Sequence, residues 1–283
     1  MFQVASRPAQ HSFDMQHQSV SLPSVQLPRT LARPTFSEVS PDAITAIEPG
    51  LAQVPLEYVR RGLHTRGDEM LASLSSLNVP HSIPRSRLPS AMDVHVAHSS
   101  SPPSHVLAIF TSPNSKHPAS DTALLLPTHH IVLAANCSLL PRLPISRPQA
   151  RANGTAALPV IPLTVPTAEA FAPLHAFLVS HRLDRFVCAL LPVPPSMLSG
   201  ARPGGSSPAN PLSHVSKPQL ATYLATASKG DRMSALMGLT RTVSAVWRNA
   251  CALGVFDRDM WAALDLAWDV ILGAMNMVAT GQV

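Results

Sequence analysis

The sequence predicts a mixed α/β domain followed by an α-helical C-terminal part, with a disordered N-terminus. The segment His105–Thr111 (HVLAIFT) is short, apolar and partly β-branched, as expected of a buried strand. Residues 160–165 are also strand-like and lead into an amphipathic helical pattern. After a Gly, Ser and Pro-rich stretch at 199–211, only helical patterns follow. We therefore divide the chain into a disordered segment (1–35), short helical elements (36–85), the α/β domain (86–198), a linker (199–214) and the helical part (215–283).

The composition favours an apolar core crossed by extended segments. Hydrophobic residues make up 46% of the 283 residues, which is ample for a sizeable core. Proline occurs 29 times, which is about twice its average usage of roughly 5%. Charged residues are 13% of the chain, about half the usual ~25%. Few charges and many prolines are not typical of an acidic or Lys-rich disordered tail.

The N-terminal part should hold short helices after a disordered start. Residues 1–35 are rich in Gln, His, Ser and Pro and show no hydrophobic periodicity, which is typical of disorder. A Ser-Pro pair favours a helix over residues 43–47, because Ser caps helices and Pro is tolerated in a first turn. Further short helices are predicted at 56–63 and 69–77.

The α/β domain should continue with strands and a short helix. Residues 92–97 are a strand candidate, and residues 131–140 are a short helix that Pro141 ends. Residues 147–156 are expected to be a loop. Pro159 and Pro162 should confine the strand at 160–165 to a sheet edge or a bulge, because proline cannot donate to the hydrogen-bond ladder.

The helix after that strand is predicted to begin at Thr167, which is a good N-cap. Pro173 then lies too deep for a first turn and should kink or shorten the helix. One apolar face is formed by Phe171, Leu174, Phe177 and Leu178.

The C-terminal part should contain three helices, at Lys217–Ala227, 232–251 and 257–278, the last capped by Asp257. In the last helix one stripe is formed by Trp261, Leu264, Trp268, Ile271 and Met275. Such a stripe is more often core. With Trp247, however, it holds every tryptophan of the chain, and aromatic side chains dominate interface energetics, so a partner-binding surface stays open.

The charge distribution argues against direct nucleic-acid binding. The net charge of +5 is spread along the chain, whereas phosphate contacts need basic side chains gathered on one face. We therefore expect no direct nucleic-acid binding, and a DNA-associated regulator that binds through a basic surface remains the alternative.

Patterns typical of enzymes and metal sites are absent. No Cys-x-x-Cys, His-x-x-x-His or Gly-x-Ser-x-Gly pattern occurs, and Gly204-Gly205 is not followed by Lys and Ser or Thr. We expect no catalytic residue, no cofactor, no metal and no small-molecule substrate. A hydrolase that uses Cys137 or a serine is the less favoured alternative, because triads can assemble from distant segments.

The compartment is expected to be the nucleus, the cytoplasm or both. The three cysteines are sparse and odd in number, so they form no disulfide framework. The N-terminus lacks the order of a signal peptide, and no uninterrupted apolar run approaches the roughly 18 residues of a membrane span.

Two segments in the middle of the chain resemble a BTB/POZ domain. Residues 124–144 (LLLPTHHIVLAANCSLLPRLP) place an apolar helix directly after a Thr-His-His step. Residues 157–186 then join a short strand to a Phe-x-x-Leu-x-x-Phe-Leu face. The resemblance implies a BTB/POZ-like domain at 86–198 that acts through contacts with proteins. It leaves open whether the chain forms a homodimer.

The C-terminal run resembles the closing segment of the clampless-type proteins of mushroom-forming and smut fungi. Trp247-Arg248-Asn249, Leu253-Gly254-Val255-Phe256-Asp257 and Ala267-Trp268 carry the similarity, and two segments near residues 36–39 and 56–60 are similar to its N-terminal boundary. The resemblance implies a regulator of sexual development that controls clamp-cell formation and the dikaryon cell cycle through partners including transcription factors.

The expected function is therefore that of a non-enzymatic protein-interaction regulator. The residues expected to bury themselves in a partner or in the protein's own core are His130, Leu133, Phe171, Phe177, Trp247, Trp261 and Trp268.

Overall fold

The computed structural model describes residues 27–96, 101–113, 121–148, 151, 154–198, 212, 214–227 and 230–282. The expected disorder of residues 1–26 and most of the expected linker, 199–211 and 213, lie outside these residues. In chain order the elements are α1 (Pro41–Ile47), η1 (Pro49–Leu51), α2 (Leu56–Thr65), α3 (Gly67–Ser75), β1 (Ser82–Pro84), η2 (Arg85–Arg87), β2 (Ala91–His95), β3 (His105–Thr111), β4 (Thr122–Thr128), α4 (His130–Asn136), β5 (Thr155–Val165), α5 (Phe171–Ser180), α6 (Leu183–Leu190), η3 (Pro195–Leu198), α7 (Lys217–Ala227), α8 (Arg232–Leu253) and α9 (Arg258–Ala279).

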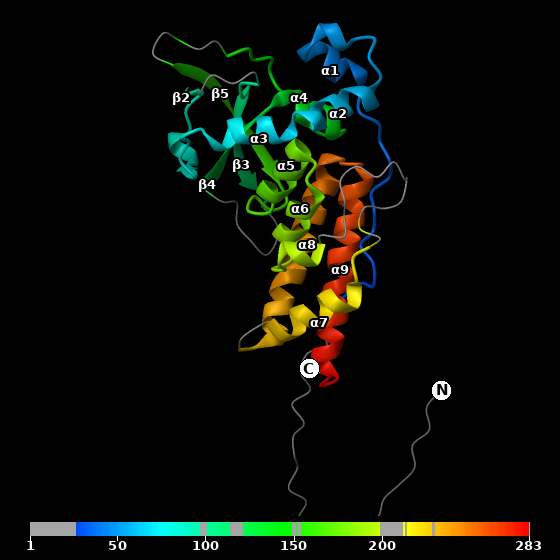
Figure 1. Cartoon of the computed structure of the whole chain (residues 1–283). Coiled ribbons are helices and arrows are strands. Elements are labelled where there is room, and N and C mark those ends of the chain that lie inside the picture. The colour runs from blue at the N-terminus through cyan, green and yellow to red at the C-terminus, as the bar shows by residue number, and fades with distance from the viewer. Residues whose placement is uncertain are drawn as a thin grey trace, which may run out of the picture.

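The five strands form one curled sheet in the order β1-β4-β3-β5-β2. β3 pairs in parallel with β5, and the other neighbours are antiparallel. The sheet and α1 to α4 lie at one end of the molecule, α5 and α6 in the middle, and α7 to α9 at the other end (Figure 1). Mixed α/β content followed by a helical part is as predicted. The sequence did not predict the strands β1 and β4, and β1 begins before residue 86, the expected start of the α/β domain.

β5 is longer than predicted and lies inside the sheet order, so its expected place at an edge was wrong. Residues 155–159 pair with β2 and residues 160–165 pair with β3, so the strand changes partner midway. The Val160 N–H donates to Ser90 on the β2 side. Because successive N–H groups of a strand alternate sides, the Pro162 nitrogen also faces the β2 side, beyond the end of that pairing. The Pro159 nitrogen faces the β3 side, before that pairing begins. Both prolines thus lie where no ladder bond is lost.

α5 begins at Phe171, which corrects the predicted start at Thr167. Its N-cap is Ala170, so Pro173 falls in the first turn, where a helix has no use for the missing N–H. Instead of capping the helix, Thr167 is held through its main chain by the Asn249 side chain of α8. The predicted apolar face of α5 is confirmed, because all four of its members are buried.

One continuous core joins the sheet to the C-terminal helices. Leu107 and Ile109 of β3 belong to it together with α5, α6, α8 and α9. The opposite face of β3, with Val106, Ala108 and Phe110, forms a smaller core inside the curled sheet. The sequence therefore folds as one packed body and not as two cores joined by a linker.

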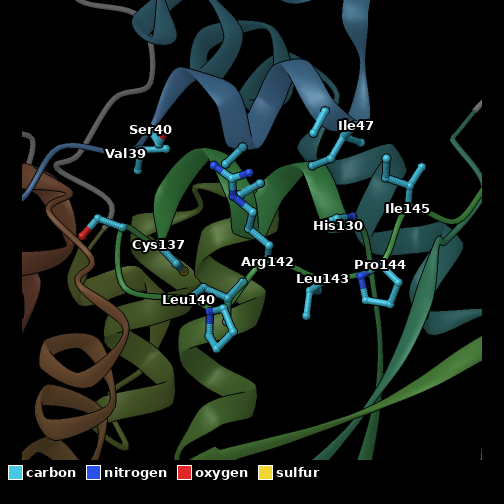
Figure 2. A pocket seen from close by; sticks show the side chains of 15 residues that line it. Val39, Ser40, Ile47, His130, Cys137, Leu140, Arg142, Leu143, Pro144 and Ile145 are labelled. Atoms are coloured by element: carbon cyan, nitrogen blue, oxygen red, sulfur yellow. The ribbon is translucent and has the colours of Figure 1, made fainter.

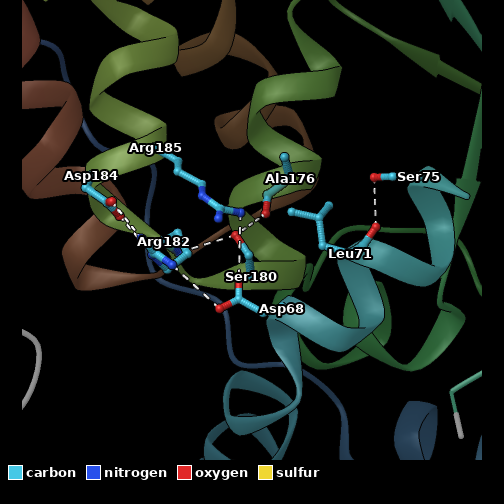
Figure 3. Close-up of polar contacts among 8 residues, drawn as sticks. All are labelled: Asp68, Leu71, Ser75, Ala176, Ser180, Arg182, Asp184 and Arg185. Atoms are coloured by element: carbon cyan, nitrogen blue, oxygen red, sulfur yellow. Dashed lines mark hydrogen bonds and ion pairs between the residues drawn. The ribbon is translucent and has the colours of Figure 1, made fainter. Parts of the chain in front are cut away.

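α3 meets the end of α5 in a close approach of main chains. A Cβ on Gly67 would lie 2.7 Å from the Val179 carbonyl oxygen and 2.9 Å from Ser180 Cα. The surface above this contact carries an ion-pair cluster, in which Asp68 lies 3.5 Å from Arg182 and 3.6 Å from Arg185 (Figure 3). The junction is thus a buried backbone contact under an exposed ionic cover.

Residues 27–36, which we call the strap, lie against the C-terminal helices (Figure 1). Residues 27–35 belong to the segment expected to be disordered, yet Leu31 is only 8% exposed. Trp247 and Trp268 hold the strap through its main chain. The tryptophan partners lie more than 200 residues away in the sequence, so local composition could not reveal them.

α9 has the length and hydropathy of a membrane span, although the sequence shows no uninterrupted apolar run of that length. About 44% of its most apolar window is buried inside the protein. It packs against α6, α7 and α8. This packing is typical of the central helix of a bundle, so the length and hydropathy of α9 are weak evidence for a membrane span.

Candidate functional site

An apolar groove of about 350 Å³ lies between α1 and α4. We call it the α1–α4 groove, and Figure 2 shows it from close by. Its third wall is the irregular segment 138–148. The apolar side chains that line the groove are Val39, Ala43, Ala46, Ile47, Ala134, Leu140, Pro141, Leu143, Pro144 and Ile145.

α4 forms the floor of this groove, and it begins directly after β4. The His130 N–H donates to Ser104 Oγ (2.7 Å), which satisfies one of the free amides at the helix start. Its ring lines the groove and is neutral, since burial, assisted by His105, lowers the pKa of His130 to about 4. Leu133 is fully buried in the main core. Of the seven predicted residues, only His130 lines the groove.

Hydrogen bonds along its length hold the irregular wall in place. The Leu139 N–H donates to the Leu253 carbonyl (3.0 Å), and Ser138 is bonded to Gly254 beside it. Farther along, His105 Nε2 donates to the Pro144 carbonyl (2.8 Å). The Arg147 guanidinium donates to the Ile47 carbonyl at the end of α1 (3.3 Å). The wall is therefore preformed without a helix or a strand.

The rim combines an exposed apolar side chain with a cation. Ile145 lines the groove and is 58% exposed, although its side chain is large and aliphatic. Arg142 lines the groove and extends toward α1 (Figure 2). Within the described residues the Arg142 guanidinium has no hydrogen-bond or ion-pair partner. Such a rim can take up aliphatic side chains and pair with an anionic group.

Cys137 lines the groove but is poorly suited to nucleophilic chemistry. Burial raises the pKa of its thiol to about 12, although the charge of Arg60 acts in the opposite direction. The reactive form of a cysteine is the thiolate, so this thiol is inert at neutral pH. Among the described residues, no hydrogen bond joins Cys137 to His129 or His130.

No group of three His, Cys, Asp or Glu side chains that could hold a metal ion is found in the part of the chain that the structure describes. His129 and His130, adjacent in sequence, diverge in space. The His129 ring contacts Ser73 and the Met70 carbonyl of α3, whereas the His130 ring lines the groove.

The remaining predicted residues lie in the core or against the strap. Phe171 and Phe177 are 0% and 1% exposed, and Phe177 contacts the Phe186 ring with centroids 4.8 Å apart. Trp261 and Trp268 are 3% and 2% exposed, whereas Trp247 is only partly buried. The stripe on α9 therefore does not present its tryptophans to solvent.

The predicted helix over residues 131–140 was too long, because α4 ends at Asn136 and not at Pro141. The sequence prediction missed Arg142 and Ile145 in the irregular segment beyond it, because such segments carry no periodicity. One signal was present. Prolines 141 and 144 alternate there with Leu140, Leu143 and Ile145, which is unusually apolar for a loop.

Comparison with protein-family models gives two matches. The first is described as Clampless protein 1 N-terminal domain and covers residues 34–166. The second is described as Clampless protein 1 C-terminal domain and covers residues 184–283. Neither a curated protein nor a solved structure matches the chain.

Proposed function

The chain belongs to the Clampless protein 1 family, and from this premise we propose that it regulates fungal sexual development by binding other proteins. The proposed partners include transcription factors of the clamp-cell programme, and the proposed site of action is the nucleus, the cytoplasm or both. The role is non-enzymatic. Its BTB/POZ-like character also stays a proposal, supported by the Thr-His-His step before α4 and by the order of β5 and α5.

The observation that carries this proposal is the α1–α4 groove. It is an apolar hollow with an exposed aliphatic side chain, Ile145, and a cation, Arg142, that has no hydrogen-bond or ion-pair partner among the described residues. A preformed wall costs little conformational entropy on binding, which favours recognition of a separate segment. The neutral His130 ring and the protonated Cys137 thiol add no charge to the floor.

The groove indicates the chemistry of the partner segment. Its lining would accept two or three aliphatic side chains on one face of a short helix or extended peptide. Arg142 would pair with an Asp or Glu carboxylate beside them, and guanidinium–carboxylate pairs add geometric specificity. We therefore propose an acidic, aliphatic segment of a regulatory protein as the occupant.

A substitution at the rim tests the proposal. We expect affinity capture of the full chain from fungal cells to enrich a reproducible set of regulators, and Arg142→Glu/Ile145→Ser to lose that set. Both side chains are exposed, so this variant should keep the melting temperature of the parent protein. Arg241→Glu, which makes the same charge change on the exposed surface of α8, is the matched control and should retain every partner.

Two outcomes would contradict the proposal. If the rim variant keeps all partners, the groove is not the interaction surface. If neither the parent protein nor the control enriches any regulator, the adaptor function itself fails.

A further inference from the structure

All three tryptophans of the chain contact the strap. Trp268 Nε1 donates to the Pro28 carbonyl (2.9 Å), and Trp247 Nε1 donates to the Ala32 carbonyl (2.7 Å). The Arg33 guanidinium lies over the Trp261 ring at 6.0 Å from its centroid. We call the side chains of Trp247, Trp261, Trp268 and Asp265 together the tryptophan seat.

The tryptophan seat binds the strap partly through the main-chain atoms of the strap. Both indole hydrogen bonds end on main-chain carbonyls, so they do not depend on which side chains the strap carries. Two side chains add specificity. Leu31 is 8% exposed and belongs to the main core, and Arg33 lies 2.6 Å from the Asp265 carboxylate. Together these contacts select an apolar residue two positions before an arginine.

The strap is attached to the rest of the protein by side-chain contacts, as a bound peptide would be. It contains no helix or strand, and among the described residues it makes no main-chain to main-chain hydrogen bond. Its residues are mostly exposed, apart from Leu31 and partly covered neighbours. Pro28 and Pro34 restrict its backbone, which lowers the entropy lost on binding. Its attachment thus rests on a few side chains of α8 and α9 and on Phe256 between them, whose ring contacts Phe36.

The family matches include the whole tryptophan seat but only the end of the strap. The N-terminal match begins at residue 34, so most of the strap precedes it, whereas the whole seat lies inside the C-terminal match. The seat therefore belongs to the shared domain, and most of the segment that fills it does not.

We propose that the tryptophan seat is a binding site for an extended, proline-containing segment with the pattern apolar-x-Arg, and that the chain's own strap occupies it in cis. A partner segment of this chemistry would have to displace the strap. Tethering gives the strap a high effective concentration at the seat, so the strap sets a threshold for binding. The site is separate from the α1–α4 groove and does not depend on the function proposed for that groove.

A labelled peptide with the sequence of residues 27–35 tests the proposal by fluorescence anisotropy. The full chain should bind it weakly. The full-length variant Leu31→Ala/Arg33→Ala, which weakens only the strap, should bind it at least ten-fold more tightly. Adding Trp247→Phe keeps an aromatic ring but removes one hydrogen bond, and should weaken peptide binding about five-fold. A peptide with Arg33→Ala should bind less well to the strap-weakened chain.

A strap-weakened variant that remains folded and binds the peptide no better than the parent chain would overturn the proposal, because the strap would then be a permanent part of the fold. Should that variant fail to fold, thiol labelling of the full-length variant Leu31→Cys decides the question, because the side chain at this position is buried while the strap is seated. Excess unlabelled peptide should speed labelling of the new thiol, followed by mass spectrometry. An unchanged labelling rate at saturating peptide would equally overturn the proposal.

Discussion

At the scale of single residues, buried side-chain amides and imidazoles connect segments that the sequence leaves unrelated. Asn249 is fully buried, and its side chain both donates to the Thr167 carbonyl (2.7 Å) and accepts from the Thr167 N–H (3.0 Å). It therefore satisfies two main-chain groups in the turn between β5 and α5. His181 does similar work at the other end of α5, where its Nε2 lies 2.7 Å from the Asp257 carboxylate that caps α9.

We predict that Asn249→Ala destabilises the protein by roughly 2–4 kcal/mol, because two main-chain groups lose their partners in a partly buried turn. Chemical denaturation would measure the free energy of unfolding. Thr167→Ala is the control. It keeps both main-chain bonds and should change stability little, whereas a Thr167 N-cap would make it cost about 1 kcal/mol. A large loss in Thr167→Ala would therefore restore the capping role.

At the scale of elements, the close approach of α3 and α5 shows why neighbouring residues differ in importance. Gly67 leaves no room for a side chain against the Val179 carbonyl. Asp68, the next residue, is 65% exposed and takes part in the ionic cluster of Figure 3. Exposed ion pairs contribute little, because water and salt screen them. The backbone contact, and not the charge cluster, should hold these helices together.

We predict that Gly67→Ala lowers the free energy of unfolding by roughly 1–3 kcal/mol through overpacking. Asp68→Ala should cost less than about 1 kcal/mol. Gly62→Ala in α2 has open space around the new Cβ and should stabilise the protein by roughly 0.5–1 kcal/mol. Thermal melts of the three variants would show the order. Equal losses for the first two would mean that the ion pairs matter as much as the contact.

At the scale of the whole molecule, the two matched family domains share one core. Leu253 and Gly254 of the C-terminal match bond the wall of the groove, which lies in the N-terminal match. Asn249 and Asp257 bond Thr167 and His181, which lie between the two matches. The protein also buries neutral histidines. Burial lowers the pKa of His64 and His130 to about 4 and that of His175 to about 3, with neighbouring histidines adding to each shift.

These histidines predict the direction in which pH changes global stability. The unfolded chain takes up protons at them near pH 6.5, whereas the folded chain resists until about pH 4. Stability should therefore be complete above pH 6.5 and fall as the pH drops toward 4. His130→Phe keeps a ring in place but cannot titrate, so denaturation at pH 7, 5.5 and 4.5 should show a shallower fall. An unchanged slope would mean that folding does not lower the pKa of His130.

Periodic segments could be predicted from the sequence, and irregular ones could not. The β3 bounds, the α7 bounds, the apolar face of α5 and the Asp257 cap of α9 all follow from patterns that repeat within a few residues. β4 was missed because Pro127 and the Thr-His-His step obscure its pattern. In the candidate site, His130 was found through its place at a helix start. Arg142 and Ile145 were not found, because nothing local distinguishes a wall residue from a loop residue.

By itself the sequence determined the class of fold, most helices and the resemblance to the clampless-type family, since these depend on short-range periodicity and on local motifs. Only the tertiary structure decided that the tryptophans face the core and the strap, that Thr167 is held from α8, and that residues 138–148 close a groove. Each of these features depends on contacts between residues far apart in the chain, such as the hydrogen bond from Trp247 to Ala32. Such contacts are stabilised by the burial of apolar side chains and by the pairing of buried polar groups. Both depend on which residues the folded chain brings together, and the local order of residues does not show this.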